Sequence, residues 1–187
     1  MNLTDINEKL KDMLPKRRLN HSLNVAECAV KLCEIYNCDN EKAYIAGIVH
    51  DCAKYLTLEE VDYYVRKYNI KLDELEMESL ALSHSIIGSY IARYEFEIND
   101  IEILDAIRYH TTGKENMSLL EKIIYMADLI EKDRNFPNVD LLRELTYSGK
   151  LDEALLISFN NTIKFVIDNN QLIHPRTVSA RNYIMKK

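Results

Sequence analysis

The stretch Gly47-Ile48-Val49-His50-Asp51-Cys52-Ala53-Lys54 places a histidine and a carboxylate side by side at the end of an apolar segment with helical spacing. An adjacent His-Asp pair offers a divalent metal one nitrogen and one oxygen ligand. In a continuous helix Lys54 lies one turn beyond Asp51, where its ammonium can face an anion that the metal holds. A surface helix end would show the same pair, so its meaning depends on the rest of the chain.

The composition favours one helical domain. With 187 residues, of which 47% are hydrophobic, the chain is long enough to bury a sizeable core. It contains only 4 Gly and 3 Pro, which leaves few residues for the many tight turns of an all-β fold. We therefore predict an all-α fold, a single-domain helical bundle.

The charge and the cysteines exclude several classes of partner. A net charge of -6 disfavours wrapping of a nucleic-acid polymer, but it is compatible with a small phosphorylated ligand held by a metal and a few cations. No apolar run approaches the roughly 20 residues that cross a bilayer, and the first residues are polar rather than signal-like. The four cysteines form no C-x-x-C pair, so neither a zinc knuckle nor a disulfide framework is indicated. We expect a soluble, cytoplasmic protein with reduced thiols and no membrane partner.

Apolar spacing, capping signals and prolines predict helices along the whole chain. Capping boxes are expected at Asp5-Glu8, Thr57-Glu60, Asn99-Glu102 and Ser118-Glu121. After a first helix that stops before Pro15, helices are predicted at residues 16–36, 41–54, 57–68, 73–82 (a short one), 83–96, 99–110, 118–130, 139–147, 151–168 and 175–185.

Six polar side chains stand out against this pattern. The histidines lie at or near the ends of predicted helices, and the aspartates lie in apolar runs, where an unpaired buried carboxylate is costly. The set consists of His21, His50, Asp51, His84, His110 and Asp128. Six mixed nitrogen and oxygen donors are too many for one tetrahedral zinc and suit one or two octahedral metals with open water positions. Spacing alone does not prove that they meet, because they are far apart in the sequence without a local metal signature, and any one of the histidines alone is more typical of a structural role.

The order of these residues resembles a known pattern. His21, His50-Asp51 and Asp128 in succession resemble the H...HD...D signature of the HD superfamily of metal-dependent phosphohydrolases, which are all-helical. His84 and His110 resemble the additional histidines of its dinuclear branch. Five segments are similar to the bacterial HD-domain symmetrical diadenosine tetraphosphate hydrolases: Arg18-Leu19-Asn20-His21-Ser22, Ala46-Gly47-Ile48-Val49-His50-Asp51-Cys52-Ala53-Lys54, His84-Ser85-Ile86-Ile87-Gly88, Ile107-Arg108-Tyr109-His110-Thr111-Thr112-Gly113 and Ala127-Asp128-Leu129-Ile130-Glu131.

The resemblance spans roughly residues 16–185 and implies both an architecture and a reaction. It implies a single HD domain over residues 1–187, with a metal-binding core at about 16–135 and C-terminal helices at about 138–186 packing on it. The implied reaction is metal-dependent cleavage of a dinucleoside tetraphosphate into two nucleoside diphosphates, by attack of a metal-bound hydroxide on an inner phosphorus. The expected partner is a nucleotide or dinucleotide, and a homodimer is left open.

The resemblance also assigns roles. The expected cofactor is a pair of divalent metals, iron first, with manganese, cobalt and zinc as alternatives. The implied metal ligands are His21, His50, Asp51, His84, His110 and Asp128. Asp51, as a bridge between the metals, and Lys54 are the expected catalytic residues. The expected substrate contacts are Arg18, Lys54, His84, His110, Thr111, Thr112, Gly113 and Arg134. A surface role for Arg18 and a plain helix stop at residues 111–113 stay open.

Two positions fall outside the metal set. Lys132-Asp133 stands where the family pattern leads us to expect Pro-Gly, which puts a loop contact in doubt but not the ligands. His174, just before Pro175, is expected to be structural. The alternatives are a nucleotidase or nucleoside triphosphate hydrolase with the same metal site, a nucleotide-binding regulator without catalysis, and a metal-free helical interaction protein.

Overall fold

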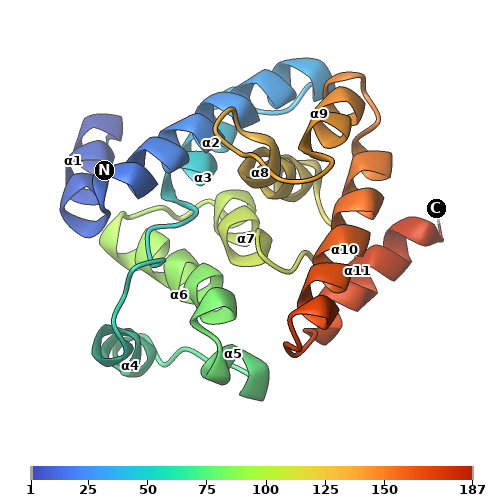
Figure 1. The fold of residues 1–187 in the computed structure, drawn as a ribbon. Helices are drawn as coiled ribbons and strands as arrows, with labels where there is room; N and C mark the ends of the chain where they lie inside the picture. Colours follow the sequence, from blue (N-terminus) through green and yellow to red (C-terminus); the bar gives the residue numbers. More distant parts are fainter. Residues whose placement is uncertain (1, 187) are drawn as a thin grey trace.

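The computed structural model describes residues 2–186, and these residues form helices and no strand (Figure 1). This confirms the predicted all-α class. The helices are α1 (Leu3–Met13), α2 (Lys16–Tyr36), α3 (Asn40–Val49), α4 (Leu58–Lys67), α5 (Glu74–Glu78), α6 (Leu80–Glu95), α7 (Ile101–Tyr109), α8 (Leu119–Ile130), α9 (Val139–Tyr147), α10 (Leu151–Asp168) and α11 (Pro175–Met185).

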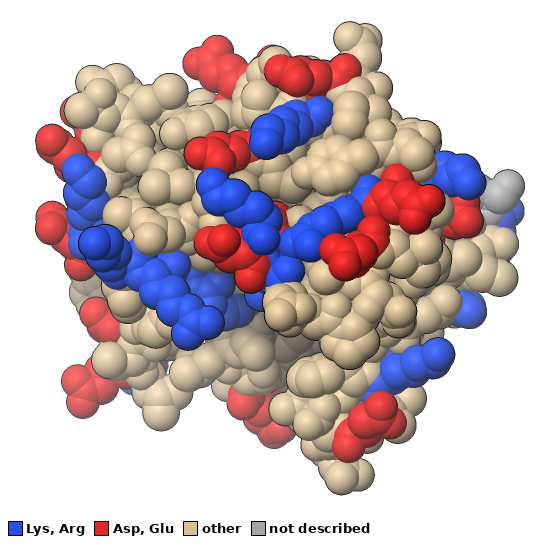
Figure 2. All heavy atoms as spheres, turned by 45° about the horizontal axis from the view of Figure 1, so that its top comes forward, with Lys and Arg blue, Asp and Glu red and all other residues tan. Residues whose placement is uncertain are grey.

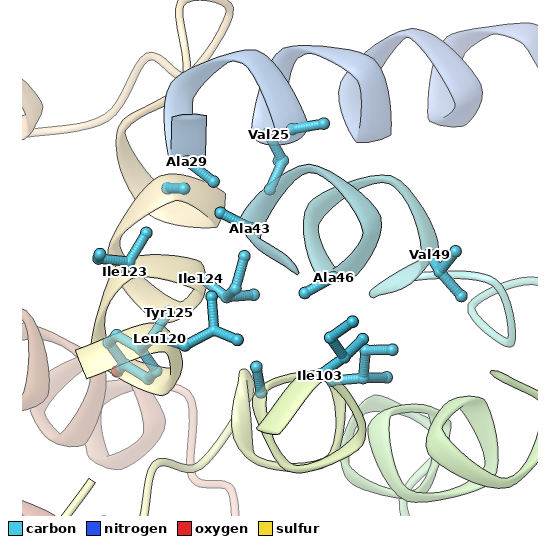
Figure 3. Packing of buried hydrophobic residues seen from close by; sticks show 14 of the residues in the cluster. Val25, Ala29, Ala43, Ala46, Val49, Ile103, Leu120, Ile123, Ile124 and Tyr125 are labelled. Carbon is cyan, nitrogen blue, oxygen red and sulfur yellow. The ribbon is translucent and has the colours of Figure 1, made fainter. Parts of the chain in front are cut away.

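The core lies between α2, α3, α7 and α8 (Figure 3). Small residues on α2 and α3 let these two helices approach closely, and the apolar side of α8 closes the space beneath them. The labelled side chains in Figure 3 come from all four helices: Val25, Ala29, Ala43, Ala46, Val49, Ile103, Leu120, Ile123, Ile124 and Tyr125. Burying one such aliphatic side chain contributes about 1.5–3 kcal/mol to the free energy of folding. Together these side chains therefore hold the four helices in fixed positions.

Side-chain caps fix where most helices begin. The capping boxes predicted for α4 and α8 are confirmed. The box predicted at Asp5 is wrong, because Asn2 caps α1 and Asp5 is its reciprocal partner. The cap predicted at Asn99 is also wrong, because the Asp100 carboxylate accepts the first free amide hydrogens of α7. Both errors shift a boundary by a few residues and leave the helix in place.

The helix predicted to run to residue 54 ends earlier. α3 ends at Val49, and the chain continues through tight turns in which the Cys52 amide donates to the Val49 carbonyl and the Lys54 amide to the Asp51 carbonyl. The four residues of α3 before the turn, 46–49, are all buried, and His50 and Asp51 in the turn continue this buried stretch. Lys54 therefore lies beyond a turn rather than one helical turn past Asp51.

The C-terminal helices pack on α8 and on each other (Figure 1). α10 contacts α8, α9 and α11, and a hydrogen bond and an ion pair tie the start of α11 to α5. His174 Nε2 donates to Asp73 at 3.0 Å, and Arg176 pairs with Glu76 at 3.0 Å. Among residues 2–186, none of the helices combines the length and apolar character that a membrane span requires.

The contact between α2 and α3 generates a stability prediction. A Cβ at Gly47 would lie 2.7 Å from the Ala26 Cα, which is backbone and cannot rotate away. Gly47→Ala should therefore destabilise the fold by about 1–3 kcal/mol, measured by denaturant unfolding. Gly88→Ala in α6 is the matched control, because its Cβ would meet no atom closer than 3.6 Å. Equal stability of the two variants would contradict this packing.

Candidate metal centre

The structure brings the six predicted ligands together at the ends of five helices. His21 and His84 lie in the second turns of α2 and α6, and Asp128 lies in the last turn of α8. His50 and His110 follow the last residues of α3 and α7, and Asp51 is next to His50. All are buried except His21 and Asp128, whose side chains are 10% and 19% exposed.

Each of the four histidines is oriented by a hydrogen bond at Nδ1. In three of them this atom lies against a backbone carbonyl of the same helix end, which accepts from N–H only and so fixes the tautomer. These pairs are His50 with Gly47 at 2.7 Å, His84 with Leu80 at 3.3 Å and His110 with Ile107 at 2.7 Å. His21 Nδ1 lies 3.1 Å from the Glu131 carboxylate. All four Nε2 atoms are thereby left to present a lone pair toward the centre.

Asp51 lies between two groups of these nitrogens. Its Oδ1 lies 3.1 Å from His84 Nε2 and 3.6 Å from His110 Nε2. Its Oδ2 lies 3.5 Å from His50 Nε2 and 3.9 Å from His21 Nε2. The other carboxylate, of Asp128, lies 2.9 Å from His21 Nε2 and 3.8 Å from His50 Nε2 through its Oδ1. The donors thus form two groups that share one carboxylate.

The donor set fits a divalent cation. Buried atoms without a hydrogen-bond partner include His21 Nε2, His50 Nε2 and Asp51 Oδ1, all of which face this centre. His84 Nε2 and His110 Nε2 lie only 3.1 Å apart, although the Nδ1 contacts make both of them acceptors. Lone pairs that converge without a proton between them are satisfied by a metal ion, and mixed imidazole and carboxylate donors accept several divalent metals. The cluster could therefore hold a divalent metal.

Two arginines contact the carboxylates of the cluster. Arg18 donates from Nη1 to Asp51 Oδ2 at 2.6 Å. Arg134 donates from Nη2 to Asp128 Oδ1, and from Nε to the Asp128 carbonyl at 2.7 Å. Each guanidinium offsets part of the negative charge that a metal would otherwise balance. Lys54 lies on the other side of the centre, with its Nζ 3.2 Å from His84 Nε2.

The surroundings favour the ionised carboxylates. Burial alone would raise the pKa of Asp51, but the neighbouring imidazoles, His50 first, outweigh it and hold the pKa well below its usual value. Burial lowers the pKa of His84 to about 4, so this imidazole is neutral at pH 7. Burial likewise lowers the pKa of Lys54, although the carboxylates oppose that shift. Ionised carboxylates and a neutral imidazole are the forms that bind metal.

Of the three residues after His110, only Thr111 reaches the cluster. Its hydroxyl lies 3.5 Å from His84 Nε2. The buried Thr112 hydroxyl donates to the Gly113 carbonyl instead, and the Gly113 amide donates to the Tyr109 carbonyl at 2.8 Å. Gly113 has a φ of 64°, and a Cβ there would lie 2.7 Å from Phe159. Thr112 and Gly113 therefore close the end of α7, and their expected contact with substrate stays a prediction.

The sequence assigned no role to Glu131, which supports the predicted metal ligand His21 from the side away from the centre. It is buried, its Oε1 holds His21 Nδ1, and its Oε2 accepts from Asn24 at 3.1 Å and from the Asp133 amide at 2.7 Å. Glu131 follows Asp128 by three residues and Asn24 follows His21 by three, so each lies on the same helix face as its ligand. Asp133, which stands where the family pattern led us to expect Pro-Gly, also accepts from Asn24, at 2.7 Å. It therefore helps to hold Asn24 and Glu131 in place.

A cleft opens on the His21 side of the centre. We call it the arginine cleft, and it has a volume of about 570 Å³ and is lined by Arg17, Arg18, His21, Tyr55, Glu131, Asp133, Arg134, Asn135 and Phe136. Figure 2, which brings the upper side of Figure 1 forward, shows Lys and Arg side chains gathered in a band interrupted by acidic ones. Although the net charge of the chain is negative, this surface therefore carries a local group of cations that suits phosphate.

Comparisons with known proteins agree with this geometry. The profile of the HD domain family matches residues 18–133. The chain is 40% identical over 184 residues to a symmetrical bis(5'-nucleosyl)-tetraphosphatase of Staphylococcus aureus, covering 98% of this chain and 94% of the relative. It is 38% identical over 176 residues to the Bacillus subtilis protein of the same description, covering 94% of each chain. The chain belongs to the HD-domain family of symmetrical bis(5'-nucleosyl)-tetraphosphatases.

A solved structure extends the agreement to the whole HD-domain fold. A protein from Clostridium acetobutylicum, described as a predicted HD superfamily hydrolase involved in NAD metabolism, superposes with a TM-score of 0.95 and is 45% identical. The superposition covers 100% of this chain and 98% of that one. The C-terminal helices, which lie outside the matched residues 18–133, are therefore shared as well.

The converging Nε2 atoms generate a prediction about metal content. His110→Ala should reduce the metal bound after purification, as measured by elemental analysis. Adding Mn²⁺ should raise the Tm of the wild type more than that of the variant, because a ligand that binds only the folded state stabilises it by about 2.7 kcal/mol at 100 times its Kd.

His174→Ala is the matched control for this measurement. His174 is the fifth histidine and is also buried, but its Nε2 faces Asp73 and its Nδ1 accepts the Arg176 amide. This variant should lose stability and keep its metal. A wild-type metal content in His110→Ala would contradict the assignment of the centre.

Proposed function

We propose that the protein hydrolyses dinucleoside tetraphosphates, such as diadenosine tetraphosphate, symmetrically into two nucleoside diphosphates. The observation that carries the proposal is the pair of donor groups on either side of Asp51. Such a pair suits a two-metal displacement at phosphorus. The chain is also 38–40% identical, over nearly its whole length, to proteins described as symmetrical tetraphosphatases, which supports this substrate class.

The proposed cofactor is a pair of divalent metals. One would be held by His21, His50, Asp51 and Asp128, and the other by Asp51, His84 and His110, with Asp51 as the bridge. Iron is our first choice, and manganese, cobalt and zinc suit the same donors. Divalent metals supply an acidified water as nucleophile and offset the charge on a phosphoryl oxygen.

The proposed role of Arg18 and Arg134 is to bind phosphate. Both line the arginine cleft, and both contact carboxylates that a metal would neutralise. When the carboxylates have a metal as partner, the two guanidiniums are released to bind substrate oxygens. Planar guanidiniums suit this role because they bind phosphate bidentately.

The proposed role of Lys54 is to stabilise charge on the departing diphosphate. Its ammonium is partly buried beside His84, on the side of Asp51 opposite the arginine cleft. A cation in a partly water-excluded site interacts more strongly with a developing charge than an exposed one does. Thr111, which also lies beside His84, can orient a phosphate oxygen through its hydroxyl.

Product analysis tests the reaction directly. The metal-loaded protein, supplied with diadenosine tetraphosphate, should release ADP as its only nucleotide product, as measured by chromatography. Release of ATP with AMP, or no turnover with several divalent metals, would contradict the proposal. Tight binding without product would favour a nucleotide-binding regulator, and faster turnover of mononucleotides would favour a nucleotidase.

Lys54→Ala tests the catalytic cation. We expect kcat to fall by about 100-fold, the usual cost of removing one group that stabilises transition-state charge, while the metal content stays at the wild-type level. Lys71→Ala, which changes an exposed lysine away from the centre, is the control and should keep full activity. Full activity in Lys54→Ala would refute the role, and loss of metal in that variant would make Lys54 a structural support of the centre instead.

A further inference from the structure

A second cavity lies beside the metal centre, opposite the arginine cleft. It has a volume of about 480 Å³ and is bounded by α5, the start of α6, the second half of α10 and the segment before α11. Its wall is mostly apolar and includes Leu75, Leu82, Ile163, Phe165 and Leu172. None of the described residues that line it is a lysine or an arginine. We call it the apolar cavity.

The apolar cavity reaches the donor cluster from the other side of Asp51. Thr111 lines it, and the Thr111 hydroxyl lies 3.5 Å from His84 Nε2, which faces Asp51 Oδ1. The arginine cleft contains His21, which faces Asp51 Oδ2. The two cavities therefore approach the two donor groups that share Asp51, one from each side.

Symmetric cleavage places a geometric demand on the protein. The bond that breaks is the central P–O–P link, so one nucleoside diphosphate half lies on each side of the scissile link. With the scissile bond over Asp51, one half runs into the arginine cleft and the other runs past Thr111. Each direction needs a surface that accepts a base and a ribose.

We propose that the apolar cavity binds the base and ribose of one nucleoside half, while the arginine cleft binds the other half. This inference rests on the proposed function and adds the place and chemistry of the second nucleoside. A symmetric substrate is thus held in two chemically different pockets.

The wall of the apolar cavity suits a nucleoside. Phe165 and Leu172 are 63% and 65% exposed, so a base could stack on these apolar side chains and cover them. Asn170 and Gln171 supply amide donors and acceptors for the edge of a base. The volume falls in the range of roughly 300–1,000 Å³ that is usual for small-molecule sites. The absence of lysine and arginine from its described wall disfavours a further phosphate there.

The cavity is also built in advance of binding. The hydrogen bond from His174 to Asp73 and the ion pair between Arg176 and Glu76 hold the start of α11 against α5, which together form one end of the wall. One partner of each pair, His174 and Glu76, is buried. A preformed wall lowers the ordering cost of binding a nucleoside.

Two substitutions test the proposal by steady-state kinetics on the metal-loaded enzyme. Phe165→Ala removes the exposed ring, and Ala81→Trp fills the cavity from an exposed position on α6, so neither disturbs the core. We expect each to raise the KM for diadenosine tetraphosphate by about 10-fold, the usual effect of losing one stacked base, with kcat within about twofold. Ile167→Ala, an equally exposed position of α10 outside the cavity, is the matched control and should leave KM unchanged.

Adenosine 5'-tetraphosphate serves as the second probe, because it has four phosphates but one nucleoside. Its inhibition constant against the dinucleotide should be unchanged in both variants, since its adenosine can occupy the arginine cleft. An unchanged KM in both variants, or an equal loss for the two ligands, would overturn the second nucleoside site. Wild-type enzyme that fails to produce ADP would instead overturn the proposed function.

Discussion

Four imidazole nitrogens and two carboxylates face one small buried volume, and the rest of the structure depends on holding them there. The hydrogen bond at each Nδ1 determines the direction of the opposite nitrogen, so the lone pairs converge whether or not a cation lies between them. A buried acceptor without a partner costs about 1–3 kcal/mol, and several such acceptors lie together here. A divalent cation, which the cluster could hold, would satisfy these acceptors, and Arg18 and Arg134 already supply part of the positive charge.

The helices provide this geometry through their ends. The close contact of α2 with α3 at Gly47 brings His21 near the residues that follow Val49. The tight turn after Val49 then carries two neighbouring polar side chains, His50 and Asp51, that are both buried. A carbonyl near a helix C-terminus is free to accept from a side chain, and His50 uses the Gly47 carbonyl in this way. Packing, helix termination and ligand orientation are therefore parts of one arrangement.

The sequence predicted those features that depend on local pattern. Apolar periodicity and capping residues determine the helices, and a carboxylate such as Asp128 is conspicuous inside an apolar run. The resemblance to a known family then ordered donors that spacing alone could not bring together. The end of α3 could not be predicted, because Cys52 and Ala53 continue the apolar pattern and are buried in a turn. The role of Glu131 could not be predicted either, because it contacts His21 and Asn24, which lie more than a hundred positions earlier in the sequence.

The loop after His110 is a second feature whose local contacts the sequence leaves open. Its Thr-Thr-Gly sequence offers hydroxyls and amides that could bind phosphate, and only the three-dimensional structure shows how they are used. Closing α7 consumes the Gly113 amide and turns the Thr112 hydroxyl inward, which leaves Thr111 beside His84. The expected contacts of Thr112 and Gly113 with substrate stay a prediction, and Thr111 is the residue of this loop that lies near the donor cluster.

Asp51 is the central residue of the proposed two-metal site, because both donor groups share its carboxylate. A crystal structure of the metal-loaded protein, with anomalous scattering recorded at the absorption edge of the bound metal, tests this most directly. We expect two anomalous peaks, one on each side of the Asp51 carboxylate: one beside His21 and His50 and the other beside His84 and His110. A single peak that Asp51 does not contact, or peaks elsewhere on the protein, would contradict it.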